Sequence, residues 1–132
     1  EKILNKKYQF LIDLNLELIK LFMKILKIKT KIVYSSKLNI NDLGTEKILK
    51  IIQQLNCDKY LTGQGKGSKR YIEGKENIFQ KNNIEIIFQK FKIPQYSQLF
   101  NEFIPNLSIC DMLFNIGSDE TQKIIESQNI NN

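Results

Sequence analysis

Apolar residues recur near the start of the chain with the period of an α-helix. Between residues 9 and 27 they form a broad face, and polar side chains interrupt it every three or four positions: Asp13, Glu17, Lys20, Lys24 and Lys27. Because this polar stripe runs along the whole segment, the pattern predicts an amphipathic helix and argues against a membrane span. The apolar face is broad enough to cover a sheet.

Short apolar runs then alternate with helical patterns. Residues 31–35, 59–62 and 84–89 have the length and composition of strands, and helical patterns end near Asn56 and occupy residues 76–81. A helix of about a dozen residues between two strands favours a right-handed crossover that joins parallel strands. The pattern therefore predicts a small three-layer α/β domain, with a mainly parallel sheet of about three strands flanked by helices.

The pattern of apolar and polar positions changes after Pro94. Residues 95–106 carry several aromatic side chains without a clean period, which predicts an ordered loop packed by those side chains. A helical run follows Ser108, and Gly117 is expected to end it in the left-handed conformation before a last helix begins.

Length and charge fit a single α/β domain over residues 1–132. Hydrophobic residues make up 42% of the chain, enough to bury a core. The net charge of +6 comes from lysines spread over every segment and not banked with aromatic residues, so we expect no specific nucleic-acid partner. The chain starts at Glu1 and reaches its first helix almost at once, which indicates a piece of a longer protein.

Histidine and cysteine content restricts the chemistry. The chain has no histidine, which removes any Ser-His-Asp or Cys-His unit within its length and the commonest metal ligand. No metal site is predicted, and the sequence leaves the identity of a cofactor open. Cys57 and Cys110 lie at the edges of apolar runs and are expected to be small buried hydrophobes. Two cysteines without a signal peptide indicate a reducing, cytoplasmic setting.

A glycine-rich loop follows the strand predicted at residues 59–62. It contains Gly63, Gly65, Gly67, Ser68, Arg70, the only arginine of the chain, and Tyr71. A forked guanidinium and the backbone amides of such a loop suit a phosphate or carboxylate. The Walker and dinucleotide-binding templates both fail at Ser68.

The position of this loop supports a binding role, because ligands of open α/β sheets collect at the carboxyl ends of parallel strands. A plain glycine turn at a strand end is the alternative. Ser35 closes the strand predicted at residues 31–35 on the same sheet edge, either as a ligand contact or as the cap of the turn that follows.

Several blocks, taken in order, resemble the WbqC-like family. They are Ser35-Ser36, Gly44-Thr45, Tyr60-Leu61-Thr62-Gly63 with its glycine loop, Pro94-x-Tyr96-x-Gln98 and, most specific, FIPNLSICDMLFNIG at residues 103–117. The chain is similar to the carboxyl-terminal half of such a protein. A complete member begins with a Gln-Pro-aromatic motif and a later Asp-Asp-Val-Gln stretch, which are not found here.

The resemblance implies a role in making bacterial-type surface polysaccharides, especially O-antigen sugars. The implied reaction attaches an acyl or aminoacyl group to an amino sugar through an amide, with a nucleotide-sugar or acyl donor as partner whose phosphate or carboxylate the glycine loop binds. Family members usually carry a histidine before the proline of the Pro-x-Tyr-x-Gln block, whereas this chain has Ile93.

Asp111 is the candidate acid/base or amine-orienting carboxylate. Uncharged donors and acceptors around one carboxylate suit a pocket that reads sugar hydroxyls and orients an amine, and the candidates are Tyr96, Gln98, Ser108 and Asn115. The structural alternatives are a helix cap for Ser108 and Asp111, a helix end for Asn115 and a core position for Tyr96. At the level of function, the alternatives are a noncatalytic binding module and general anion binding through lysines.

Overall fold

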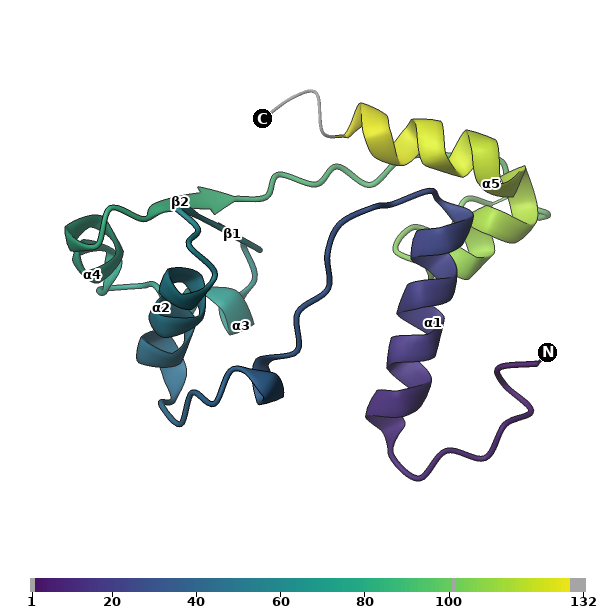
Figure 1. The fold of residues 1–132 in the computed structure, drawn as a ribbon. Helices are drawn as coiled ribbons and strands as arrows, with labels where there is room; N and C mark the ends of the chain where they lie inside the picture. The colour runs from purple at the N-terminus through teal and green to yellow at the C-terminus, as the bar shows by residue number, and fades with distance from the viewer. Residues whose placement is uncertain (1, 101, 129–132) are drawn as a thin grey trace. The chain divides into compact units, whose positions relative to one another are not determined.

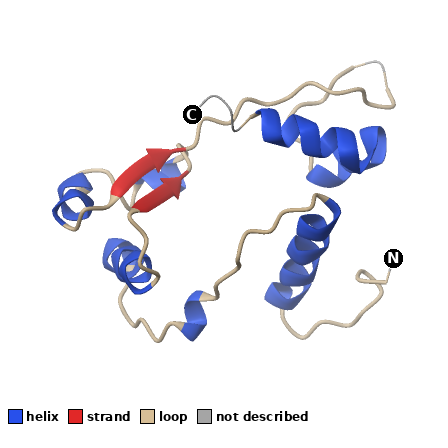
Figure 2. Ribbon diagram, turned by 45° about the horizontal axis from the view of Figure 1, so that its top comes forward, coloured by secondary structure: helices blue, strands red, loops and turns tan. Residues whose placement is uncertain are grey.

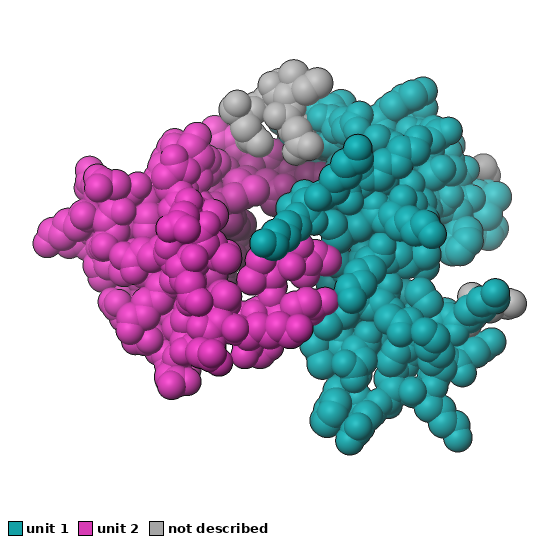
Figure 3. All heavy atoms as spheres, viewed as in Figure 1, with its two compact units in different colours: residues 1–31, 92–131 teal, residues 32–91, 132 magenta. Residues whose placement is uncertain are grey.

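The computed structural model describes residues 2–100 and 102–128 (Figure 1). Its elements follow in the order α1 (Leu11–Ile25), η1 (Ser35–Lys37), α2 (Gly44–Gln54), β1 (Lys59–Thr62), α3 (Lys66–Lys69), α4 (Glu76–Lys81), β2 (Glu85–Phe88) and α5 (Ile109–Ser127). The described residues fall into two compact units (Figure 3). Unit 1 contains those up to Lys31 and from Lys92 onward, and unit 2 those from Ile32 to Phe91.

Unit 2 is built around a parallel pair of strands (Figure 2). β1 and β2 pair from Lys59 opposite Glu85 to Thr62 opposite Phe88, and the connection between them carries α3 and α4. The mixed helix and strand content and the parallel pairing confirm the broad α/β prediction. The predicted count of about three strands is wrong, because the described residues form a sheet of two.

The strand predicted at residues 31–35 is the one that the structure does not contain. The segment is an extended loop that leads into the 3₁₀ turn η1, and Tyr34 has the dihedral angles of a strand, with φ −94° and ψ 116°. An extended segment becomes a strand only when its backbone pairs with another, and this one joins no ladder among the described residues. Composition predicted its local conformation and not its pairing.

The core of unit 2 forms where α2 and α4 meet the sheet. Its buried residues are Leu49, Ile52, Ile72, Phe79 and Ile84. The Phe79 side chain is fully buried and stacks on Tyr60 of β1, with ring centroids 5.7 Å apart. This cluster holds the parallel pair against the helices, and it therefore fixes where β1 ends and the glycine loop begins.

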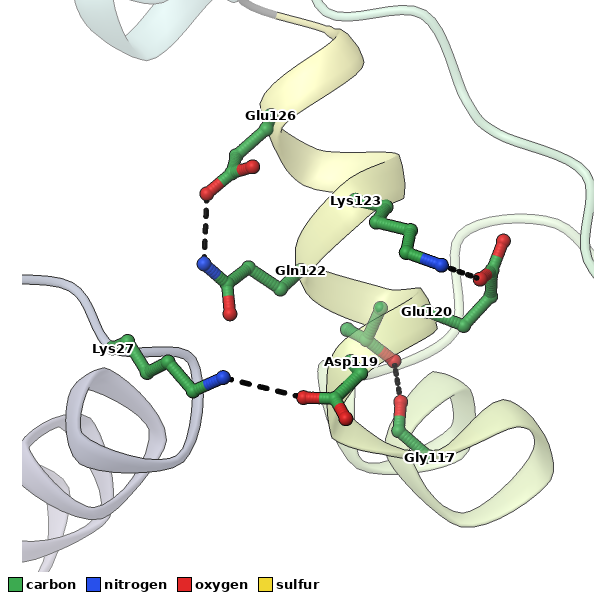
Figure 4. A network of polar contacts seen from close by, with 8 residues as sticks. Lys27, Gly117, Asp119, Glu120, Gln122, Lys123 and Glu126 are labelled. Atoms are coloured by element: carbon green, nitrogen blue, oxygen red, sulfur yellow. Dashed lines mark hydrogen bonds and ion pairs between the residues drawn. The ribbon is translucent and has the colours of Figure 1, made fainter.

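Unit 1 consists of α1, α5 and the loop before α5. α1 matches the predicted amphipathic helix, but none of its residues is fully buried and unit 1 contains no strand among its described residues, so α1 covers no sheet there. Within unit 1, Lys27, which follows α1, pairs with Asp119 of α5 at 3.3 Å (Figure 4). Both cysteines are free thiols, and the prediction that each is buried is wrong, because Cys57 is exposed and Cys110 is only half-buried.

Gly117 divides α5 into two helical pieces. Its φ of 76° and ψ of 174° are not helical, which confirms the predicted positive φ at this glycine. The buried Thr121 side chain donates a hydrogen bond to the Gly117 carbonyl at 2.6 Å. The break therefore has a fixed geometry, and it separates the piece that carries Asp111 from the rest of the helix.

Replacing Gly117 with alanine is expected to lower the free energy of unfolding by about 1–3 kcal/mol, because only glycine enters this backbone region without strain. Urea titration followed by circular dichroism measures the change. Gly67→Ala is the matched control, since Gly67 lies in α3 with open space around an added Cβ atom. A loss of equal size in both variants would contradict the assignment of strain to Gly117.

Candidate functional site

The start of α5 places Asp111 in the first turn of a helix. Ser108 is the N-cap: its side-chain oxygen accepts a hydrogen bond from the Cys110 amide at 3.3 Å, and its carbonyl accepts one from the Asp111 amide at 2.9 Å. Ser108 therefore has the capping role. The Asp111 carboxylate does not complete a capping box and is directed to the preceding loop instead.

The Asp111 carboxylate joins two of the predicted polar residues in one cluster. Its Oδ2 atom accepts hydrogen bonds from the Tyr96 hydroxyl at 2.8 Å and from Gln98 Nε2 at 3.1 Å. Gln98 Nε2 also lies 3.2 Å from the Tyr96 oxygen, so one of its protons is shared between the two acceptors. All three side chains are half-buried and reachable from solvent. We call this group the Asp111 cluster.

The other half of the Gln98 amide closes the loop. Gln98 Nε2 donates to the Ile104 carbonyl at 3.0 Å, and the Ile104 amide donates to Gln98 Oε1 at 2.8 Å. The side chain thus pairs with the Ile104 backbone as a neighbouring strand would. Phe103 meets the Tyr96 ring edge to face, with centroids 5.5 Å apart. Tyr96, Gln98 and Phe103 therefore hold described parts of the loop together, whereas Phe100, which was predicted to pack there, is 85% exposed.

The pKa of Tyr96 is shifted by its place in this cluster. Burial raises the pKa of the Tyr96 hydroxyl above its ordinary value, and the hydrogen bond to Asp111 raises it further, while the Gln98 amide works in the opposite direction. The hydroxyl is consequently a stable donor to Asp111 through the physiological range of pH. Asn115 takes a different part, since its Nδ2 donates to the backbone carbonyl of Asp111 at 2.8 Å and not to the carboxylate.

The glycine loop belongs to unit 2 and follows the end of β1. It contains the single helical turn α3, and none of Gly63, Gly65 and Gly67 has a left-handed φ. A Cβ atom at Gly63 would lie 3.3 Å from the Ser68 hydroxyl oxygen, so the loop folds back closely on itself. Glycine at position 63 leaves room for this close approach, and its backbone angle is not an unusual one.

Arg70 is exposed and lies against Tyr71. Its guanidinium carbon is 4.6 Å from the centre of the Tyr71 ring, and Nη2 donates to the Tyr71 hydroxyl. The Tyr71 carbonyl accepts from the buried hydroxyl of Thr45 at 2.7 Å, and Lys75 donates to that same hydroxyl at 3.2 Å. The turn that presents Arg70 is thereby fixed to the start of α2.

The predicted site residues thus form two groups. Tyr96, Gln98, Ser108, Asp111 and Asn115 come together in unit 1, and the residues of the glycine loop come together in unit 2. Ser35 is in unit 2 at the start of η1, where its carbonyl accepts from the Leu38 amide at 3.2 Å. It does not end a strand, so the reason for placing it on a sheet edge with the glycine loop is wrong.

No group of three or more metal-ligating side chains comes together in residues 2–100 and 102–128. Over the same residues, no helix combines the length and apolar character that crossing a bilayer requires.

A comparison with protein families decides the relationship. The sequence profile of the WbqC-like protein family matches residues 1–123. The chain belongs to the WbqC-like family. The resemblance seen in the sequence blocks is confirmed, and the Asp111 cluster lies in the matched region.

One similar protein is the Uncharacterized protein Rv1507c of Mycobacterium tuberculosis, which is 28% identical to this WbqC-like chain over 107 residues. The match covers 80% of this chain and 45% of that protein, so the chain spans less than half the length of this relative. No solved structure matches the chain.

Sequence reasoning missed some residues of this WbqC-like chain that support the two groups of site residues. The Ile104 backbone and the Phe103 ring contact the Asp111 cluster, and both lie in the most specific block of the family resemblance. Thr45 and Lys75 support the Arg70 turn, whereas the sequence had offered Thr45 as a possible cap of the second helix and as part of a family block. Backbone partners and long-range supports leave no local pattern, so block membership was the available signal.

Replacing Tyr96 with phenylalanine is expected to remove a pH-dependent part of the stability. Because the folded pKa is raised, the hydroxyl keeps its proton longer in the folded chain than in the unfolded one. Its contribution is therefore complete below about pH 10 and is lost as the pH rises through the folded pKa. Urea titrations at steps above and below that pH should show wild type losing stability relative to Tyr96→Phe. If the free energy of unfolding changed with pH in the same way in wild type and in Tyr96→Phe, the assigned role of the hydroxyl would be contradicted.

Proposed function

We propose that this chain is part of a WbqC-like transferase of surface-polysaccharide biosynthesis that forms an amide between an acyl or aminoacyl group and an amino sugar. The observation that carries the proposal is the convergence of one carboxylate, one hydroxyl and one amide in the Asp111 cluster. Such a set suits a sugar amine, because a carboxylate accepts from the nitrogen while uncharged groups contact hydroxyls.

The arrangement leaves Asp111 suited to handle a proton. Both hydrogen bonds to its carboxylate from the described residues go to Oδ2, so Oδ1 is the oxygen that faces a ligand. In amide formation the sugar nitrogen bonds to the acyl carbon, and the bond from that carbon to its leaving group breaks with the electron pair going to the leaving group. The nitrogen then gives up a proton, and Asp111 Oδ1 accepts it.

The glycine loop is assigned the anionic part of the donor. It follows the carboxyl end of β1 in a parallel pair, where ligands of α/β sheets collect. Arg70 is an exposed guanidinium there, and its stacking on Tyr71 preorganises the planar fork that a phosphate or carboxylate accepts. The partner proposed for this loop is a nucleotide-sugar or acyl donor.

A noncatalytic binding module is the alternative, and two observations favour it. Tyr96, Gln98 and Asp111 bond to one another and tie the loop to α5, which is a structural use of the same groups. Ile93, which is 47% exposed, stands before Pro94 where the family resemblance leads us to expect a histidine. In this reading the chain binds the sugar and another segment supplies the chemistry.

Asp111→Asn is expected to weaken binding of UDP-glucosamine by about tenfold or more, because a charge-assisted hydrogen bond to the sugar amine is lost. Binding of UDP-N-acetylglucosamine, which has no amine to pair, should change little. Titration calorimetry on the full chain measures both. Asp119→Asn is the matched control, since Asp119 is an exposed carboxylate on the same helix and pairs with Lys27.

Tyr96→Phe separates the amine contact from loop order. It removes a bond that holds the loop but leaves the carboxylate in place. Losses of equal size in Tyr96→Phe and Asp111→Asn would assign the effect to loop order and favour the binding-module alternative. No binding of either nucleotide sugar to wild type would overturn the assignment of Asp111 to an amino sugar.

Arg70→Ala is expected to weaken binding of UDP alone by about tenfold, through loss of the bidentate contact to phosphate. Lys81→Ala is the control, because Lys81 is an exposed cation of α4 outside the loop. Equal losses in both variants, together with steep salt dependence, would point to general anion binding by lysines and against a specific role of the loop.

A further inference from the structure

A second site lies in unit 1, separate from the Asp111 cluster. α1, α5 and the segment before α1 enclose a half-open groove with a volume of about 610 Å³, within the range of small-molecule sites. Its walls come mainly from residues at helical spacing on two helices: Leu18, Phe22 and Ile25 of α1, and Cys110, Leu113 and Phe114 of α5. The Phe114 side chain at its rim is 90% exposed.

The third wall is a short strap that hydrogen bonds hold on α1. We call residues 2–8 the strap; Ile3 and Leu4 line the groove. The Tyr8 hydroxyl lies 3.0 Å from both the Ile3 carbonyl and Glu17 Oε2. Lys6 donates to both oxygens of Glu17, at 2.9 and 2.8 Å, and this bond lowers the pKa of Glu17. The groove is thus closed along one side by a tethered segment.

The lining selects an aliphatic ligand and not a sugar. Among the described residues that line the groove, the polar side chains are Lys2, Cys110 and Ser118. A sugar loses its hydration on entry and needs several hydrogen-bonding partners, which this lining does not offer. An aliphatic chain needs no hydrogen-bonding partner. Lys2 carries the one formal charge of the lining, so the complementary head group is an anion.

We propose that the groove binds a single-chain aliphatic carboxylate, with its chain along the α1 and α5 walls and its carboxylate at Lys2. The site does not depend on the amide-forming function proposed for the Asp111 cluster. A second copy of this chain and a bilayer surface are the alternative occupants. The experiments below separate both of them from a free fatty acid.

Titration with octanoate, decanoate and dodecanoate below their micelle concentrations is the direct test. We expect saturable binding of one molecule per chain, tightening by about fourfold for each added methylene, because each is transferred from water to an apolar wall. Phe114→Gln should weaken dodecanoate binding, whereas Phe100→Gln should not, since Phe100 is an equally exposed ring of unit 1 outside the groove. Both rings are exposed, so neither substitution removes a buried side chain from the core.

The head group is tested with Lys2→Gln. This variant should weaken dodecanoate binding severalfold and leave dodecanol binding unchanged, while Lys24→Gln, an exposed cation of α1 outside the lining, should affect neither. The cysteines give a second readout: bound dodecanoate should slow the reaction of Cys110 with a thiol reagent and leave that of the exposed Cys57 unchanged.

Several results would overturn the proposal. They are affinity that does not depend on chain length, equal effects of the two phenylalanine variants, and equal protection of both cysteines. Light scattering that shows a dimer dissociated by Phe114→Gln would assign the groove to a second copy. Binding to phosphatidylglycerol vesicles without binding to monomeric dodecanoate would assign it to a lipid surface.

Discussion

The carboxylate of Asp111 holds the irregular segment before α5 in one arrangement. That segment has no regular element of its own, so the entropy lost on ordering it must be offset by a small number of side-chain contacts. Tyr96 and Gln98 both donate to one carboxylate oxygen, and the Gln98 amide also hydrogen bonds to the Ile104 backbone. Linked bonds of this kind stabilise more together than separately, which makes the carboxylate the common element of the cluster.

The same bonds give the cluster its chemical character. A ligand group that reaches the free side of the carboxylate meets an oxygen whose position is already fixed by Tyr96 and Gln98. Fixed polar groups cost no reorganisation when a charge develops beside them. The structural role of Asp111 is therefore compatible with the ligand recognition proposed for it, because the first would supply the preorganisation that the second requires.

The sequence predicted those features that depend on neighbours along the chain. The strand at residues 59–62 and the helix at residues 76–81 were predicted with the bounds that the structure has, because length, composition and period are local. The prediction of a strand at residues 31–35 was wrong, because the pairing of one strand with another does not depend on neighbours along the chain. Family blocks brought Tyr96, Gln98 and Asp111 into one hypothesis. The backbone partner at Ile104 had no signature, since any residue carries the same amide and carbonyl.

The two-stranded sheet has a consequence for how the chain behaves when concentrated. In the part of the chain that the structure describes, the sheet has two strands, so β1 and β2 are both edge strands, and the edge of a sheet is a template on which other chains add and aggregate. Each strand is only four residues long, and Lys59 and Glu85 place opposite charges at its start, 3.5 Å apart. Shortness and charge are two means by which natural sheets prevent edge-to-edge association, and this sheet uses both.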